Sequence, residues 1–156
     1  MIEIERYAGQ QANVNSYLLS DTNSMIVVDL LRNSVEAERL ADHTEASGKE
    51  LAAILITHGY PDHYIALGVF HRRFPSAPVK VASAEIRDDI IGFSQWMESV
   101  GRLEPEPRMK VKSDQNPDGF GYAGVIQVLA RPFLELPLEP TRIQVQSDYP
   151  GSESGT

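Results

Sequence analysis

One uninterrupted apolar run, LAAILIT from Leu51 to Thr57, constrains the fold of this 156-residue chain more than any other feature. A strand that is apolar at successive positions needs cover on both faces, as the inner strands of parallel and mixed sheets have. Helical patterns, with apolar residues three and four positions apart, lie on either side of the run, after Asn33 and from Tyr64 onwards. The run therefore predicts a layered α/β fold with this strand inside the sheet.

The other patterns continue this layered order. Strands are expected at residues 2–7, 14–19, 25–29 and 79–82, and helices after Asn33, over 64–73 and after Ser83. The second and third of these strands are expected to pair as a hairpin, because the residues between them favour turns. The remainder, residues 104–156, holds seven of the ten prolines and only strand-like pieces, at 125–130, 133–136 and 142–145.

Composition excludes several classes of function. The 14 Lys and Arg against 22 Asp and Glu give a formal charge of −8, which does not suit binding to nucleic acid or anionic lipid. The absence of cysteine removes disulfides, thiolate metal sites and cysteine nucleophiles. No apolar run approaches the ~18 residues of a membrane span, and the N-terminus lacks the pattern of a signal peptide. We therefore expect a cytoplasmic protein with no nucleic-acid or membrane partner.

The segment most suggestive of chemistry is the loop after the apolar run, which holds His58, Asp62 and His63. A loop at the carboxyl end of an inner strand is the usual place for an α/β active site. Two imidazoles and a carboxylate so close in sequence are donors that zinc or iron accepts. Asp62 can also orient or deprotonate a water on such a metal. The alternative is a polar loop in which Asp62 only caps the helix that begins near Tyr64.

The loop THGYPDH resembles the His-x-His-x-Asp-His loop of the metallo-β-lactamase superfamily. The segments VNSYLL, MIVVD and LAAILITHG follow one another as they do in that family, and Tyr149 to Ser152 lie where it has a Pro-Gly-His turn. The resemblance implies an α/β fold, the family's αββα sandwich, of which residues 1–156 form only the N-terminal half: a mixed sheet with helices on one face. In this single truncated domain, the Pro-rich portion 104–156 is expected to form strands and loops, with a flexible tail at 148–156.

The same resemblance implies roles for individual residues. His58 matches a ligand of the family's first metal, and Asp62 and His63 match ligands of its second metal, with Asp62 also as the catalytic proton carrier. Tyr60 and Ser152 stand where the family has two further histidines of the first metal. A catalytic zinc needs three protein ligands and an open position, so the site is expected to be incomplete.

Two other features allow alternatives. Asp29, at the tip of a predicted strand, either hydrogen-bonds a metal-ligating histidine, as the family suggests, or caps the strand end. Phe93, Trp96 and Met97 lie close together on a predicted helix. They either line a substrate entrance or pack in the core, and their helical spacing favours the core.

Together these features predict a metallo-β-lactamase-type hydrolase with an incomplete dinuclear metal site that is weak or inactive as this chain. The expected cofactor is zinc, with iron or manganese as alternatives, bound weakly or not at all, and the substrate of an active form is a small molecule. The alternative is a degenerate, non-catalytic relative that serves as an interaction or assembly module, or a fragment of a longer protein. Because half of a two-sheet fold leaves an apolar face uncovered, we expect a homo-oligomer or a partner that covers the missing half.

Overall fold

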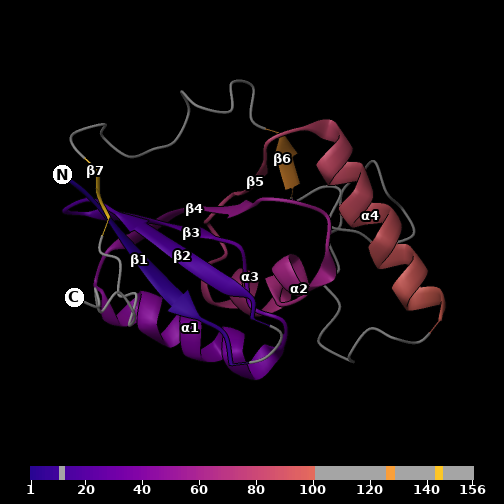
Figure 1. The fold of residues 1–156 in the computed structure, drawn as a ribbon, viewed down its shortest axis with the longest axis horizontal. Coiled ribbons are helices and arrows are strands. Elements are labelled where there is room, and N and C mark those ends of the chain that lie inside the picture. The colour runs from indigo at the N-terminus through magenta and orange to yellow at the C-terminus, as the bar shows by residue number, and fades with distance from the viewer. Residues whose placement is uncertain (11–12, 101–125, 129–142, 146–156) are drawn as a thin grey trace, which may run out of the picture.

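The structure, a computed structural model, describes residues 1–10, 13–100, 126–128 and 143–145. Within these residues, seven strands form one sheet with four helices beside it (Figure 1). The strands are β1 (Ile2–Ala8), β2 (Asn15–Ser20), β3 (Ser24–Val28), β4 (Glu50–Ile56), β5 (Val79–Val81), β6 (Ile126–Val128) and β7 (Ile143–Val145). The helices are α1 (Ser34–Ala46), α2 (Pro61–Tyr64), α3 (Leu67–Arg73) and α4 (Ala84–Ser99). None of the helices in this described part is both long and apolar enough to cross a membrane.

β4, which the apolar run forms, is an inner strand of the sheet, as predicted. The strand order is β6-β5-β4-β3-β2-β1-β7. β1, β2 and β3 pair antiparallel and include the predicted hairpin, whereas β3, β4, β5 and β6 run parallel and β7 runs parallel to β1. The sheet is therefore mixed, and the carboxyl ends of β3 and β4 meet at one edge.

The main core lies between the sheet and the helices. Leu18, Val27 and Ile54 point from the sheet into this core, and Leu40 of α1 and Phe70 of α3 meet them there, all of them buried. Figure 1 shows α1 and α3 together on one side of the sheet. A mixed sheet with helices on one face is the arrangement that the sequence predicts.

The opposite face of the sheet, which we name the far face, is also apolar. It consists of two buried residues with partly buried ones around them: Ile26 and Ala53, with Ile2, Leu19, Val28 and Leu55. Tyr17, which pairs with Val28 across β2 and β3, lies on this face and is 39% exposed. Both faces of β3 and β4 are therefore apolar, which explains the uninterrupted apolar sequences of these strands.

α1 is held by an N-cap and by ion pairs. Asn33 Oδ1 accepts a hydrogen bond from the backbone N of Glu36 at 2.9 Å. Arg73, at the end of α3, forms ion pairs with three carboxylates of α1, those of Glu38, Asp42 and Glu45. The hydrogen bonds to Glu45 and Asp42 raise the pKa of the Arg73 guanidinium above its usual range. These contacts join α1 to α3 along their exposed side.

The helical pattern over residues 64–73 is not the single helix that we predicted. α2 begins already at Pro61, because the fixed φ of proline suits the first helical position. Ala66 then adopts φ −85° and ψ 11°, so the helix is interrupted before α3 begins at Leu67. The expected strand at 133–136 and the turn from Tyr149 to Ser152 lie outside the described residues.

Replacement of Asn33 tests the contribution of the cap. Asn33→Ala removes the acceptor for the Glu36 N–H and is expected to lower the free energy of unfolding by about 1 kcal/mol. Urea unfolding followed by circular dichroism measures the change. Asn33→Asp keeps an acceptor at the helix N-terminus and is the matched control, so an equal loss in both variants would contradict the capping role.

Candidate metal centre

The candidate site is built around Asp29, at the carboxyl end of β3. Asp29 is buried, and its φ of 58° is a left-handed conformation that Asp tolerates better than most residues. Its N–H donates to the carbonyl of Leu55 at 2.8 Å, which continues the pairing of β3 with β4. The next residue, Leu30, donates its N–H to the carbonyl of His63 at 2.7 Å. The turn at Asp29 therefore lies between the end of β4 and the first turn of α2.

Three hydrogen bonds converge on the Asp29 carboxylate. Oδ1 accepts from the backbone N of Thr57 at 2.8 Å, and Oδ2 accepts from Thr57 Oγ1 at 2.6 Å. Oδ2 also lies 2.9 Å from Nδ1 of His63. Because a carboxylate only accepts hydrogen bonds, Nδ1 of His63 carries the proton of this contact. Hydrogen bonds to a carboxylate are among the strong ones, so Asp29 holds β4 and α2 in one arrangement.

The same reasoning places the proton of His58. Its Nδ1 lies 2.8 Å from Thr57 Oγ1. The Thr57 hydroxyl donates its one proton to Asp29, so it accepts from His58. Both histidines therefore carry their proton on Nδ1 and keep the lone pair of Nε2 free. A histidine whose Nδ1 proton is held by an acceptor is typical of metal sites, because this contact fixes the tautomer and the ring orientation.

The two imidazoles lie close enough to share one ion. Their ring centroids are 3.9 Å apart. In the described part of the chain, Asp29, His58 and His63 form a group in which one donor atom of each lies within 4.8 Å of the others. Two imidazole nitrogens and a carboxylate oxygen are donors that zinc and iron accept, so these residues fit such an ion. Asp29 already accepts three hydrogen bonds, which favours it as the group that orients the histidines.

The other predicted site residues lie outside this three-residue group. Asp62 is in the first turn of α2 and partly exposed. Tyr60 is 67% exposed, and its ring meets that of His58 nearly edge-on, at a centroid distance of 5.0 Å. Ser152 lies outside the described residues. The metal-ligand and proton-transfer roles of Asp62, and the replacement of ligands at Tyr60 and Ser152, stay predictions.

Thr57 is a site residue that the sequence patterns did not indicate. Its hydroxyl connects Asp29 to His58. A threonine at the end of an apolar strand carries no functional signal, because β-branched residues favour strands in general. Only the meeting of β3 and β4 at one edge reveals what this hydroxyl binds.

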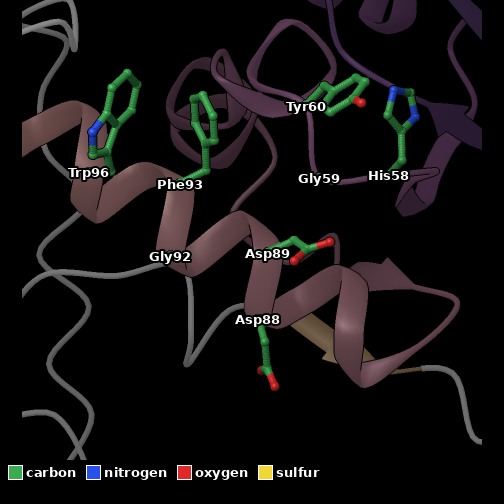
Figure 2. Close-up of a pocket in the computed structure, with 8 residues that line it drawn as sticks. All are labelled: His58, Gly59, Tyr60, Asp88, Asp89, Gly92, Phe93 and Trp96. Carbon is green, nitrogen blue, oxygen red and sulfur yellow. The ribbon is translucent and has the colours of Figure 1, made fainter.

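A groove of about 680 Å³ opens between the histidine loop and α4. Figure 2 shows the rings of Phe93 and Trp96 pointing from α4 toward the side on which Tyr60 lies. Met97, by contrast, is buried. Met97 therefore packs in the interior, as its helical spacing favours, whereas Phe93 and Trp96 line a groove next to His58. That a substrate enters by this groove stays a prediction.

Gly59 permits the close approach of the histidine loop to α4. A Cβ at this position would lie 2.7 Å from the Cβ of Asp89, closer than real side chains come. Below the loop, the hydroxyl of buried Tyr64 donates to the carbonyl of Ile90 at 3.4 Å, and burial raises the pKa of this phenol. The loop and the helix are therefore in direct contact, and glycine sets the spacing.

Two glycine substitutions test this contact. Gly59→Ala is expected to lower the free energy of unfolding by about 1–3 kcal/mol, because the loop and α4 have to move apart. Gly92→Ala, within α4 and with no atom within 4 Å of the new Cβ, is expected to raise it by about 0.5–1 kcal/mol through helix propensity. Urea unfolding of the three proteins measures both changes. Similar effects of the two substitutions would contradict a specific constraint at Gly59.

Comparisons with known sequences place the chain in a family. A sequence model described as the metallo-beta-lactamase superfamily matches residues 9–144. A protein of Streptococcus pyogenes serotype M6, named a probable metallo-hydrolase, is 26% identical over 133 residues, which are 85% of this chain and 47% of that protein. The chain thus spans about half the length of this relative.

Solved metallo-beta-lactamases resemble the chain to different degrees. The metallo-beta-lactamase SMB-1, crystallised with 2-mercaptoethanesulfonate, has a TM-score of 0.51 and 19% identity, with 81% of this chain and 44% of that chain covered. The B3 metallo-beta-lactamase BLEG-1 has a TM-score of 0.46 and 24% identity, with 55% and 39% covered. The likeness to SMB-1 concerns the fold alone, whereas the sequence match extends over most of the chain. On that match, the chain belongs to the metallo-beta-lactamase superfamily.

Proposed function

We propose that the chain is a metal-dependent hydrolase of this superfamily that holds one divalent ion, zinc in the first instance, through Nε2 of His58 and His63. The observation that carries the proposal is the hydrogen-bond network of Asp29 and Thr57, which leaves both Nε2 atoms free. The name of the S. pyogenes relative, a probable metallo-hydrolase, supports the same class of reaction. The substrate we propose is a small molecule with a hydrolysable bond.

Each residue of the site has a separate task in this proposal. Bound zinc supplies a Lewis acid that polarises a carbonyl or phosphoryl oxygen and makes water more acidic. Asp29 accepts the Nδ1 proton of His63 and, through Thr57, orients that of His58, so that both rings stay in the ligating tautomer. Asp62, next to His63 in the first turn of α2, takes the proton that hydrolysis releases.

The proposed site would bind zinc weakly, because only two imidazoles serve as its ligands. A catalytic zinc needs three protein ligands and an open position. Tyr60 offers a neutral phenol where the family has a histidine, and a phenol is a poor substitute for an imidazole. We therefore propose low affinity for zinc, with iron and manganese as alternative ions, and slow hydrolysis. A chain that has lost metal binding altogether would act as a non-catalytic module.

Zinc titration of the chelator-treated protein, in competition with a chromophoric chelator, tests the metal site. We expect one ion per chain, and loss of binding in His58→Ala and in His63→Ala. Tyr60→His adds an imidazole beside His58 and is expected to raise the affinity about tenfold or more. His43→Ala is the matched control, because His43 lies on α1, where it pairs with Glu5 and its ring contacts that of Tyr7, and it does not belong to the three-residue group.

Two outcomes would contradict the metal site. One is the absence of zinc uptake in both the natural chain and Tyr60→His, which would leave the non-catalytic function. The other is zinc uptake that His58→Ala and His43→Ala lower equally, because the ion would then lie elsewhere. Hydrolysis of a panel of ester, thioester and phosphodiester substrates, with and without zinc, measures the proposed activity of the same variants.

The far face supports a second candidate function, self-association. Its apolar residues lie on neighbouring strands, whereas α1 and α3 pack on the other side of the sheet. Ile26 and Ala53 are already buried, whereas the residues around them keep part of their apolar surface exposed, and Tyr17 is 39% exposed. A second copy of the same face offers a self-complementary partner that would bury this remaining surface around a two-fold axis. We therefore propose that two copies of this chain pack their far faces together.

Sedimentation velocity over a concentration series tests self-association. We expect a dimer at micromolar concentration that Tyr17→Lys shifts toward monomer, because the substitution puts a charge on the far face. Val35→Lys replaces an exposed apolar residue of α1 and is the matched control. A natural chain that stays monomeric throughout and melts cooperatively would contradict the proposal.

A further inference from the structure

The groove beside the histidine loop has a wall of exposed aromatic rings. Phe93 and Trp96 are 38% and 49% exposed although both are large apolar side chains. Their ring centroids lie 5.2 Å apart and their planes are tilted by 59°. Tyr60 adds a third exposed ring on the loop side (Figure 2). Exposed rings that gather around one hollow indicate a ligand that stacks on them, because water solvates such surface poorly.

Asp89 adds an uncompensated negative charge to this groove. Figure 2 shows its carboxylate pointing toward the part of the loop that holds His58 and Gly59. Among the residues that the structure describes, Asp89 has no ion-pair partner, whereas its neighbour Asp88 accepts hydrogen bonds from Arg87 at 3.0 and 3.1 Å. Figure 2 also shows Asp88 pointing away from the three rings. Both carboxylates line the groove, but that of Asp88 is paired with Arg87, so the unpaired charge among the described lining residues is that of Asp89.

We propose that this groove binds a small organic cation, an aryl- or alkylammonium group, with its apolar part against Phe93 and Trp96 and its charge near Asp89. The faces of aromatic rings attract cations, and tryptophan does so most strongly. The carboxylate of Asp89, which has no ion-pair partner among the described residues, also attracts a cation. The volume of about 680 Å³ lies within the range of small-molecule sites, roughly 300–1,000 Å³.

The proposal also limits the class of substrate that we expect at the adjacent metal site. His58 belongs both to that site and to the lining of the groove. A substrate seated here would place its cationic, apolar end on α4 and its hydrolysable bond toward the histidines. This part rests on the proposed hydrolase function. Binding of the cation itself does not, because none of the three rings is among the proposed metal-ligating residues.

Trp96 is the single tryptophan of the chain, so its fluorescence reports on this groove directly. The probe is benzyltrimethylammonium, and benzyl alcohol and benzoate are the neutral and anionic comparisons. Titrations are made on the full chain with a chelator present and at about 0.15 M salt, which screens the long-range attraction of the net negative charge. We expect saturable quenching by the cation, roughly fivefold tighter than by benzyl alcohol, and none by benzoate.

Substitutions at two neighbouring residues distinguish a specific contact with the cation from an effect of the overall charge. Asp89→Asn is expected to remove the preference for the cation, whereas Asp88→Asn, with the same change of charge, keeps it. Trp96→Leu lacks the fluorescent signal, so its binding is followed by saturation-transfer NMR of the probe and is expected to be lost. Circular dichroism confirms that each variant is folded.

Three results would overturn the proposal. They are equal binding of benzyl alcohol and the cation, an equal loss in Asp88→Asn and Asp89→Asn, and unchanged binding in Trp96→Leu. Failure of zinc binding can be distinguished from failure of cation binding, because these titrations contain a chelator and do not depend on zinc. Cation binding by a chain that takes up no zinc would support the groove and contradict only the hydrolase.

Discussion

The carboxylate of Asp29 is the group on which the local structure depends. It accepts hydrogen bonds from the backbone N and Oγ1 of Thr57 and from Nδ1 of His63. It therefore connects the ends of β3 and β4 to α2. A buried carboxylate without partners would cost several kcal/mol, and here three donors offset that cost. The left-handed backbone at Asp29 is part of the same arrangement, because the strain it carries is retained only where surrounding contacts over-determine the conformation.

The loop that Asp29 anchors has two sides with different chemistry. His58 and His63 turn their rings toward each other on one side, and Gly59 and Tyr60 border α4 on the other. Gly59 rests against Asp89 because it has no Cβ, which brings the histidines and the aromatic wall of α4 within one small region. The proposed metal site and the proposed ligand groove are therefore neighbours, and His58 belongs to both groups of residues.

Much of the fold follows from sequence pattern because its elements are locally consistent. The apolar run became the inner strand β4, the strand expected at residues 2–7 became β1, and the helix expected after Asn33 became α1. The pattern over residues 64–73 failed, since Pro61 starts a helix earlier and Ala66 interrupts it. The helical spacing of apolar residues cannot by itself locate such a break, because this spacing continues on both sides of it.

What the sequence by itself determined is the family, a mixed sheet with helices on one face, and the histidine loop at the end of an inner strand. The family and the one-sided sheet follow from the resemblance of the histidine loop and its flanking strands to known members, whereas the inner strand follows from its uninterrupted apolar sequence, and a sequence displays both directly. Only the tertiary structure decided that Asp29 and Thr57 set the tautomers of His58 and His63, and that Phe93 and Trp96 face a groove while Met97 is buried. These relations join residues far apart in the chain, and hydrogen-bond geometry and side-chain direction exist only after the strands and helices have packed.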